Sequence, residues 1–124
     1  MSDLAQGLAE VFERFGPVES RRMFGGHGIY HQGRMFGLVA RGTLYLKSDA
    51  QNVAEFDRLR LPAFEFARGD KMMRTSYRQA PPELFEDREV AARWARLAWE
   101  AAQRSSTGPK RPRPSQPRPR RTGA

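Results

Sequence analysis

Short apolar runs broken by glycine occupy the stretch from Arg22 to Lys47, and they limit what this chain can fold into. The runs read RMF, GIYH, RMFGLVA and TLYLK, and none is long enough for an amphipathic helix. Two of the breaks, Gln32-Gly33 and Arg41-Gly42, lie nine residues apart and have glycine where a two-residue hairpin turn needs a positive φ. The pattern predicts an antiparallel β-meander.

Strand alternation assigns the side chains of this meander to the two faces of a sheet. The expected groups are Phe36, Leu38 and Ala40 on one face of their strand and, on the next strand, Leu44 and Leu46 opposite Tyr45 and Lys47. The side chains of the two MF pairs are expected to help fill the core; they are Met23, Phe24, Met35 and Phe36.

The glycines of GGHG allow two interpretations. In the first they supply turns and let strands approach closely, so that they matter for folding. In the second they form a loop that contacts a partner, centred on Gly26 and His27. The dinucleotide-binding motif is not met, because His31 stands where that motif needs glycine and strand follows where it needs helix.

Helical periodicity flanks the meander on both sides. The first apolar stripe runs from Leu4 to Phe15 and ends at Gly16-Pro17, and a second, after Asp49, includes Val53, Phe56 and Leu59. A second hairpin is expected around RGDK, then a short turn after Pro82 and a last helix capped by Asp87. The order predicts an α+β fold, a two-layer sandwich in which the antiparallel meander and the hairpin pack against helices.

Trp99 does not belong to the apolar stripe of this last helix. At about 100° per residue it points roughly 140° away from Trp94. It is therefore expected either to form a contact surface for a partner or to pack on a neighbouring hairpin of the same chain.

Charge divides the chain into two parts, residues 1–104 and residues 105–124. The second part has no acidic residue and contains five of the nine prolines. Because it has no large apolar residue, it is expected to be a disordered basic tail that binds nucleic acid weakly and without base readout. Its basic residues, the candidate nucleic-acid contacts, are Lys110, Arg111, Arg113, Arg118, Arg120 and Arg121.

Little catalytic chemistry is expected from the remaining residues. The chain has no cysteine and only two histidines, His27 and His31, which on one strand would lie about 13 Å apart, too far to share an ion. They are expected to face solvent. No catalytic residue, cofactor site or metal site is predicted. No run of about 18 apolar residues suggests a membrane span, and the N-terminus is acidic where a secretory signal would be basic, so a cytoplasmic location is expected.

One stretch partly matches an RNA-binding strand motif. RMFGLVAR, from Arg34 to Arg41, agrees with it at Arg34, Phe36, Gly37 and Val39 but has Leu38 where an aromatic side chain would stack on a base. An RNA-binding sheet therefore stays an alternative.

Several motifs together resemble the N-terminal domain of the TfoX/Sxy family. They are RMFGGHGIY with Gly33, then MFGLVARGTLYLK, FEF, the segment from Met73 to Tyr77, and RWARLAWEAA. The resemblance covers about Leu4 to Ala102. It implies an α/β sandwich on an antiparallel sheet and a role in transcriptional co-regulation of natural competence, together with a partner like the cyclic-AMP receptor protein. The family's better-known members carry a second, helical domain, where this chain has only the basic tail.

Two hypotheses of function follow. In the first, the chain is a small regulatory module whose folded part contacts a protein partner while its tail contacts nucleic acid. In the second, it is an enzyme or small-ligand-binding domain with an unfamiliar cleft near Tyr30, Tyr45 and Tyr77. Carboxylates converging on a tyrosine or histidine in a concave pocket would favour the second.

Overall fold

The computed structural model describes residues 3–23 and 25–106 of the 124-residue chain. In chain order the elements are α1 (Asp3–Val11), β1 (Glu19–Met23), β2 (Gly26–His31), β3 (Arg34–Ala40), β4 (Thr43–Lys47), α2 (Val53–Arg58), β5 (Ala63–Arg68), β6 (Lys71–Gln79), the 3-10 helix η1 (Pro82–Phe85) and α3 (Arg88–Ser106). The last helix therefore continues two residues past the expected end of the folded part. None of the helices described here is long and apolar enough to cross a membrane.

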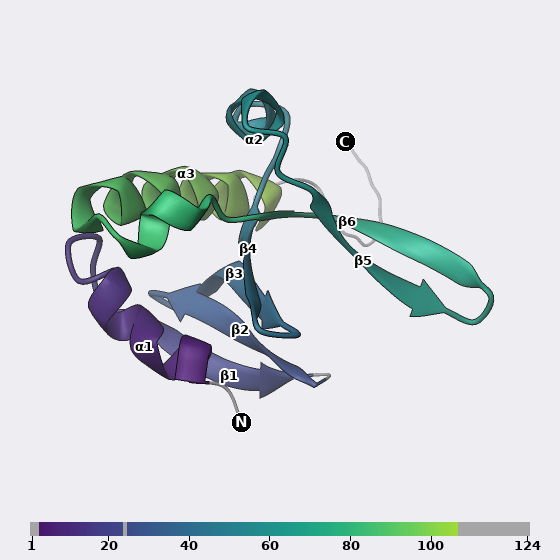
Figure 1. Cartoon of the computed structure of the whole chain (residues 1–124), viewed down its shortest axis with the longest axis horizontal. Coiled ribbons are helices and arrows are strands. Elements are labelled where there is room, and N and C mark those ends of the chain that lie inside the picture. Colours follow the sequence, from purple (N-terminus) through teal and green to yellow (C-terminus); the bar gives the residue numbers. More distant parts are fainter. Residues whose placement is uncertain (1–2, 24, 107–124) are drawn as a thin grey trace, which may run out of the picture.

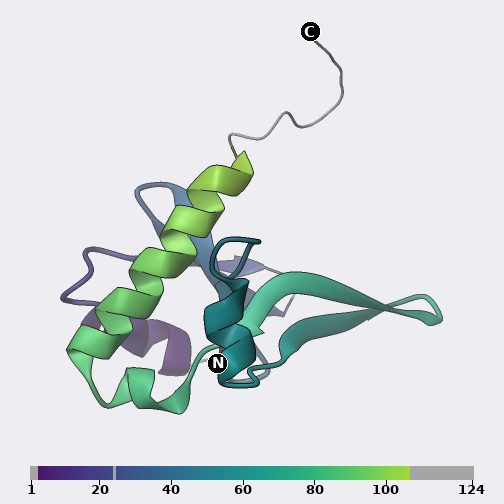
Figure 2. The same cartoon turned by 90° about the horizontal axis from the view of Figure 1, so that it is seen from above.

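The strands form one six-stranded sheet in the order β1-β2-β3-β4-β6-β5, with every neighbouring pair antiparallel. The helices α1 and α3 lie on one side of it, and the β5–β6 hairpin extends away from the body (Figure 1). Seen from above, this hairpin is a projecting arm (Figure 2). The predicted α+β fold is confirmed.

The two turns of the meander have the backbone conformation that the sequence predicts. At the β2–β3 turn, Gln32 has φ 53° and Gly33 has φ 80°, and at the β3–β4 turn Arg41 has φ 53° and Gly42 has φ 77°. Two successive positive φ values are typical of type I′ turns, whose twist matches that of the strands they join. The meander prediction is confirmed.

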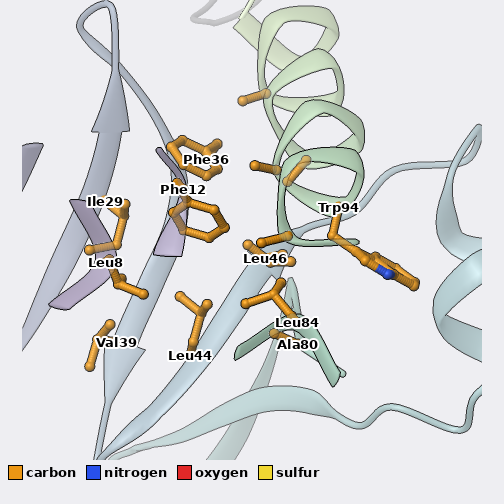
Figure 3. Close-up of a cluster of buried hydrophobic side chains, with 14 of the residues drawn as sticks. Leu8, Phe12, Ile29, Phe36, Val39, Leu44, Leu46, Ala80, Leu84 and Trp94 are labelled. Carbon is orange, nitrogen blue, oxygen red and sulfur yellow. The ribbon is translucent and has the colours of Figure 1, made fainter. Parts of the chain in front are cut away.

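The core lies between the helices and one face of the sheet, which we call the helix-covered face (Figure 3). Phe12 and Phe36 meet edge to face, with ring centroids 5.8 Å apart, and neither is exposed to solvent. Other fully buried side chains come from α1, the central strands and η1; they include Leu8, Ile29, Leu44, Leu46 and Leu84. Full burial of each such side chain stabilises the fold by about 1.5–3 kcal/mol.

A β-bulge in β3 overturns one expectation about the sheet faces. Ile29 pairs with Gly37 whereas Tyr30 pairs with Met35, so that Phe36 is an extra residue between the two pairs. Phe36 is consequently buried in the core, but Leu38 lies on the opposite face, together with Ala40. The prediction that these three side chains share a face was wrong, since strict alternation does not hold across a bulge.

The prediction that both methionines of the MF pairs fill the core was also wrong. Met23 and Met35 line a groove on the other face of the sheet, which we call the open face. Met35 and Phe36 are consecutive and point to opposite faces by ordinary strand alternation, and the bulge puts Met35 on the same face as Leu38. Phe24 lies outside the described residues.

Candidate functional site

The open face of the sheet carries an apolar groove with a volume of about 520 Å³. Its lining comes from strands β1 to β3 on one side and from the β5–β6 arm on the other. Its lining residues are Met23, Gly26, Met35, Leu38, Ala40, Phe64, Phe66, Thr75, Ser76 and Tyr77. A volume of this size accommodates a small ligand or a few large side chains of a protein partner.

The floor of the groove depends on Gly28. A β-carbon at this position would lie 2.8 Å from the sulfur of Met23, 3.0 Å from the Tyr30 ring and 3.1 Å from the sulfur of Met35. Glycine thus lets these three side chains meet over the β2 backbone, and the floor is built of polarizable groups that adapt to differently shaped partners.

The wall of the groove is aromatic and comes from the arm. The rings of Phe64 and Phe66 stack with centroids 6.2 Å apart, and Phe64 also contacts Tyr45 at 5.1 Å. The Thr75 hydroxyl donates a hydrogen bond to the carbonyl oxygen of Phe64 at 3.0 Å, which fixes the irregular pairing at the base of the arm. Phe66 remains 37% exposed and Met73 36% exposed, so the arm presents apolar surface to solvent.

The three tyrosines named in the second hypothesis do lie on this face. Tyr77 lines the groove, Tyr30 lies beside the two methionines of its floor, and Tyr45 packs behind Phe64. Burial raises the pKa of Tyr77 to about 12, with a smaller contribution from Tyr30. Among the described lining residues there is no carboxylate or imidazole, so the converging acid and base groups that would favour an enzyme are not found in this groove.

Two cations lie beside residues of the groove or its floor contacts. The ammonium group of Lys47 lies 2.6 Å from the hydroxyl of Ser76 and 5.3 Å from the centre of the Tyr77 ring. Burial lowers the pKa of Lys47, partly offset by Asp49. The guanidinium of Arg21 lies 4.3 Å above the Tyr30 ring and pairs with Glu19.

Gly26 and His27, the candidate partner contacts of GGHG, lie in strand β2 and not in a loop. Gly26 is buried, and a β-carbon there would lie 2.2 Å from the carbonyl oxygen of Val39. This contact supports the structural interpretation of the glycine. His27 is half-buried, and its Nδ1 atom is shielded from solvent without a hydrogen-bond partner among the described residues. Contact of either residue with a partner stays a prediction.

Trp99 packs within the chain, as the second interpretation of this residue expected. Its indole nitrogen donates to the carbonyl oxygen of His31 at 3.1 Å, and its ring meets those of His31 and Phe15. It is partly buried against the core, on the helix-covered side of the sheet. The structure therefore does not bring Trp99 to the groove, and its contact with a partner stays a prediction.

The expectation that both histidines face solvent was wrong. His31 is 8% exposed, and its Nδ1–H donates to the carbonyl oxygen of Pro17 at 2.7 Å. The aromatic rings of Phe15 and Trp99 cover it, which explains why a polar residue is buried at the end of β2. Among the described residues no group of His, Asp and Glu is arranged to hold a metal ion.

The structure offers no exposed aromatic side chain in β3 for the RNA-binding alternative. Its motif relies on aromatic side chains on an exposed sheet face, but Phe36 is fully buried under α1 and Leu38 takes the open-face position. The six tail residues predicted to contact nucleic acid, from Lys110 to Arg121, lie outside the described residues.

Sequence reasoning missed most of the groove lining. Met23 and Met35 were assigned to the core, Leu38 was placed on the same strand face as Phe36, and Phe64 and Phe66 were predicted only as part of a hairpin. One signal could have located the groove: β3 has large apolar residues at consecutive positions, which means that both of its faces are apolar and that both need cover.

Comparison with known proteins identifies the family of this chain. The chain matches the TfoX N-terminal domain family over residues 10–102. It is also similar to DNA transformation protein TfoX1 of Aliivibrio fischeri (strain ATCC 700601 / ES114), with 30% identity over 91 residues, which are 73% of this chain and 43% of that protein. The chain spans less than half the length of that relative. It belongs to the TfoX N-terminal domain family, as its sequence motifs predicted.

Proposed function

We propose that this chain is a cytoplasmic regulatory module, not an enzyme, that takes part in the control of DNA transformation by contacting a protein partner through the groove. The observation that carries the proposal is the groove itself, a concave and almost wholly apolar surface with aromatic walls and no acid or base group in its described lining. Apolar surfaces of this extent on a soluble domain typically bind another protein. The link to transformation comes from the name of the TfoX1 relative.

A partner of the kind that the family resemblance implies, a transcription regulator like the cyclic-AMP receptor protein, belongs to this proposal. The second hypothesis of the sequence stays open as a competing one, because a groove of about 520 Å³ also suits a small apolar ligand.

Two phenylalanines of almost equal exposure provide a matched test. Phe66 is 37% exposed and lines the groove, whereas Phe85 is 36% exposed and lies on η1, away from it. We expect Phe66→Glu to reduce transformation frequency in the native cell at least about tenfold, because a carboxylate there must be desolvated when a partner binds. Phe85→Glu should leave it within about twofold. If both variants are folded and equally active in transformation, the groove is not the regulatory surface.

The proposal has a second part, which concerns the basic tail. Six cations on residues 105–124 would neutralise several phosphates and release counterions, giving weak affinity that is independent of base sequence. In the folded part, Arg21 and Arg22 are consecutive residues of β1 and point to opposite faces, so these two do not form one basic patch.

We expect truncation after Ser106, the last residue of α3, to abolish most duplex DNA binding. Fluorescence anisotropy at several salt concentrations measures this. For the full chain the slope of log affinity against log salt should be no steeper than about −5, from roughly −0.9 for each neutralised phosphate. Equal DNA binding by the truncated and full chains would remove the tail from the proposal and direct attention to the arginines of the folded part.

A further inference from the structure

The groove has a chemical character that restricts its partner. Taking the proposed protein contact as given, we infer that the groove receives an amphipathic helix of the partner whose apolar stripe is flanked by carboxylates. The apolar lining supports the apolar stripe of this helix. The backbone pairing of the strands beneath the groove supports its helical conformation, and the charges around the groove support its carboxylates.

The lining of the groove indicates that the partner helix has an apolar stripe. Sulfur and aromatic groups meet on the open face, with Met23 and Met35 on the floor and the stacked Phe64 and Phe66 on the wall. An antiparallel sheet usually exposes one polar face to water, but this sheet is apolar on both faces and its helices cover only one. A partner that covers the second face supplies the missing layer.

The strand pairing of the sheet indicates that the partner segment is helical. Strands β2, β3, β4 and β6 each have a hydrogen-bonded neighbour on both sides, and these backbone hydrogen bonds lie in the plane of the sheet. In the part of the chain that the structure describes, the free edges are those of β1 and β5, which supply Met23, Phe64 and Phe66 to the lining of the groove. An occupant that packs on the face of β2 and β3, and not along one of these edges, must satisfy its own backbone groups, which a helix does.

The charges around the groove indicate that the partner helix carries carboxylates. The nearest carboxylate to Lys47 in sequence, that of Asp49, is bound by Arg104 at 2.5 and 3.0 Å, and Lys47 forms no ion pair with any described residue. Its half-buried ammonium is held beside the groove by Ser76. A partner carboxylate placed there would replace water around a cation that is already partly desolvated.

The other rim charges are also mainly positive. Arg21 lies over Tyr30, and Arg68 and Lys71 form the outermost pair of the arm, two positions beyond the Phe66–Met73 pair and on the same face. The carboxylates on this side are Glu19, which already pairs with Arg21, and Asp70 in the turn of the arm. A helix flanked by lysines would meet repulsion from these cations.

A display library of helical peptides tests this inference on the full chain. The peptides have about 18 residues, with Leu, Ile, Met or Phe at positions i, i+3, i+4 and i+7 and free choice at the flanking positions. We expect the selected peptides to be enriched in Asp and Glu at the flanks. The best peptide is then synthesised in three forms: as selected, with each carboxylate changed to its amide, and with a central proline that breaks the helix.

Fluorescence anisotropy then ranks the peptides and the protein variants. The selected peptide should bind at least about tenfold more tightly than its amide and proline forms. Phe66→Glu should weaken it at least about tenfold, Phe85→Glu should not, and Lys47→Met should remove most of the preference for the acidic form over the amide form. The inference is overturned if no acidic helix is selected, if the proline form binds equally well, or if Phe66→Glu has no effect.

Two further outcomes separate this inference from the proposed function. If the peptides fail but Phe66→Glu still abolishes transformation, the regulatory surface is right and the acidic helix is wrong. Self-association that Phe66→Glu abolishes in analytical ultracentrifugation would assign the groove to a second copy of the chain and also overturn the inference. If an acidic helix binds as described but Phe66→Glu leaves transformation unchanged, the groove is a helix-binding site and the proposed function fails.

Discussion

Gly26→Ala is expected to lower the free energy of unfolding by about 3 kcal/mol, among the largest effects of any single methyl group in this chain. The added carbon would lie 2.2 Å from the carbonyl oxygen of Val39, a separation that real contacts do not reach. The obstacle is backbone, so it cannot rotate away. Strands β2 and β3 would have to separate where His27 pairs with Val39. Thermal unfolding should show a melting temperature about 10–20 °C lower.

Gly7→Ala is the control for this experiment. Gly7 lies on the exposed side of α1, and a β-carbon there meets nothing within 4 Å. Because alanine loses less conformational entropy in a helix than glycine does, this substitution should stabilise the domain by about 0.5–1 kcal/mol. A result in which both variants unfold at the temperature of the unchanged chain would mean that β2 and β3 are farther apart in solution.

The contrast between Gly26 and Gly28 shows how far the sequence predicted these glycines. Their location among strands was predicted from the runs around them, as was a role in close approach of strands. What each glycine faces was not predictable. Gly26 meets the backbone of β3, but Gly28 makes room for the side chains of Met23, Tyr30 and Met35. This difference depends on strand register, which no single run of residues specifies.

Local signals predicted the elements well. The turns at Gln32-Gly33 and Arg41-Gly42 need only local backbone chemistry, and both formed as expected. The carboxylate of Asp87 accepts hydrogen bonds from the backbone of Glu89 and Val90, so the expected cap of α3 is also present. These features depend on interactions within a few residues, and therefore a sequence pattern is enough to find them.

The groove could not be predicted in the same way, because it depends on contacts far apart in the chain. Strand β6 pairs with β4 although the whole of α2 and β5 separates them in sequence. That pairing brings Tyr77 beside Lys47 and joins the arm to the sheet, so that residues of both line the groove. The bulge at Phe36 then assigns Met35 and Leu38 to the open face. The sequence did suggest a cleft near Tyr30, Tyr45 and Tyr77, but not its apolar character or the residues that form it.

Asn52→Ala is expected to destabilise the domain by about 2–4 kcal/mol, with a fall in melting temperature of about 10–20 °C. Asn52 is 3% exposed and joins three elements. Its side-chain oxygen accepts from the backbone N–H of Asp49 at 2.8 Å, and its amide nitrogen donates to the carbonyl oxygens of Lys47 at 3.3 Å and Leu97 at 3.1 Å. Alanine would leave these buried groups without a partner and would loosen α3 from the end of β4. The exposed neighbour is the control: Gln51→Ala should change stability by less than about 0.5 kcal/mol.

The pH dependence of the stability of Asn52→Asp tests whether the side chain of Asn52 donates these hydrogen bonds. An ionised carboxylate accepts only, so at neutral pH it would face the carbonyl oxygens of Lys47 and Leu97 without a proton to donate. Burial and these carbonyls would raise the pKa of the new carboxyl in the folded state above its unfolded value of about 3.9. The folded state then binds the proton more tightly, so stability should be lowest at neutral pH and should rise, relative to the unchanged chain, as pH falls toward 4. Chemical denaturation of both chains between neutral pH and about pH 4 measures the difference. If the loss of stability were the same at every pH, the amide of Asn52 would not be donating to those two carbonyls, and the connection between β4 and α3 would rest on apolar packing alone.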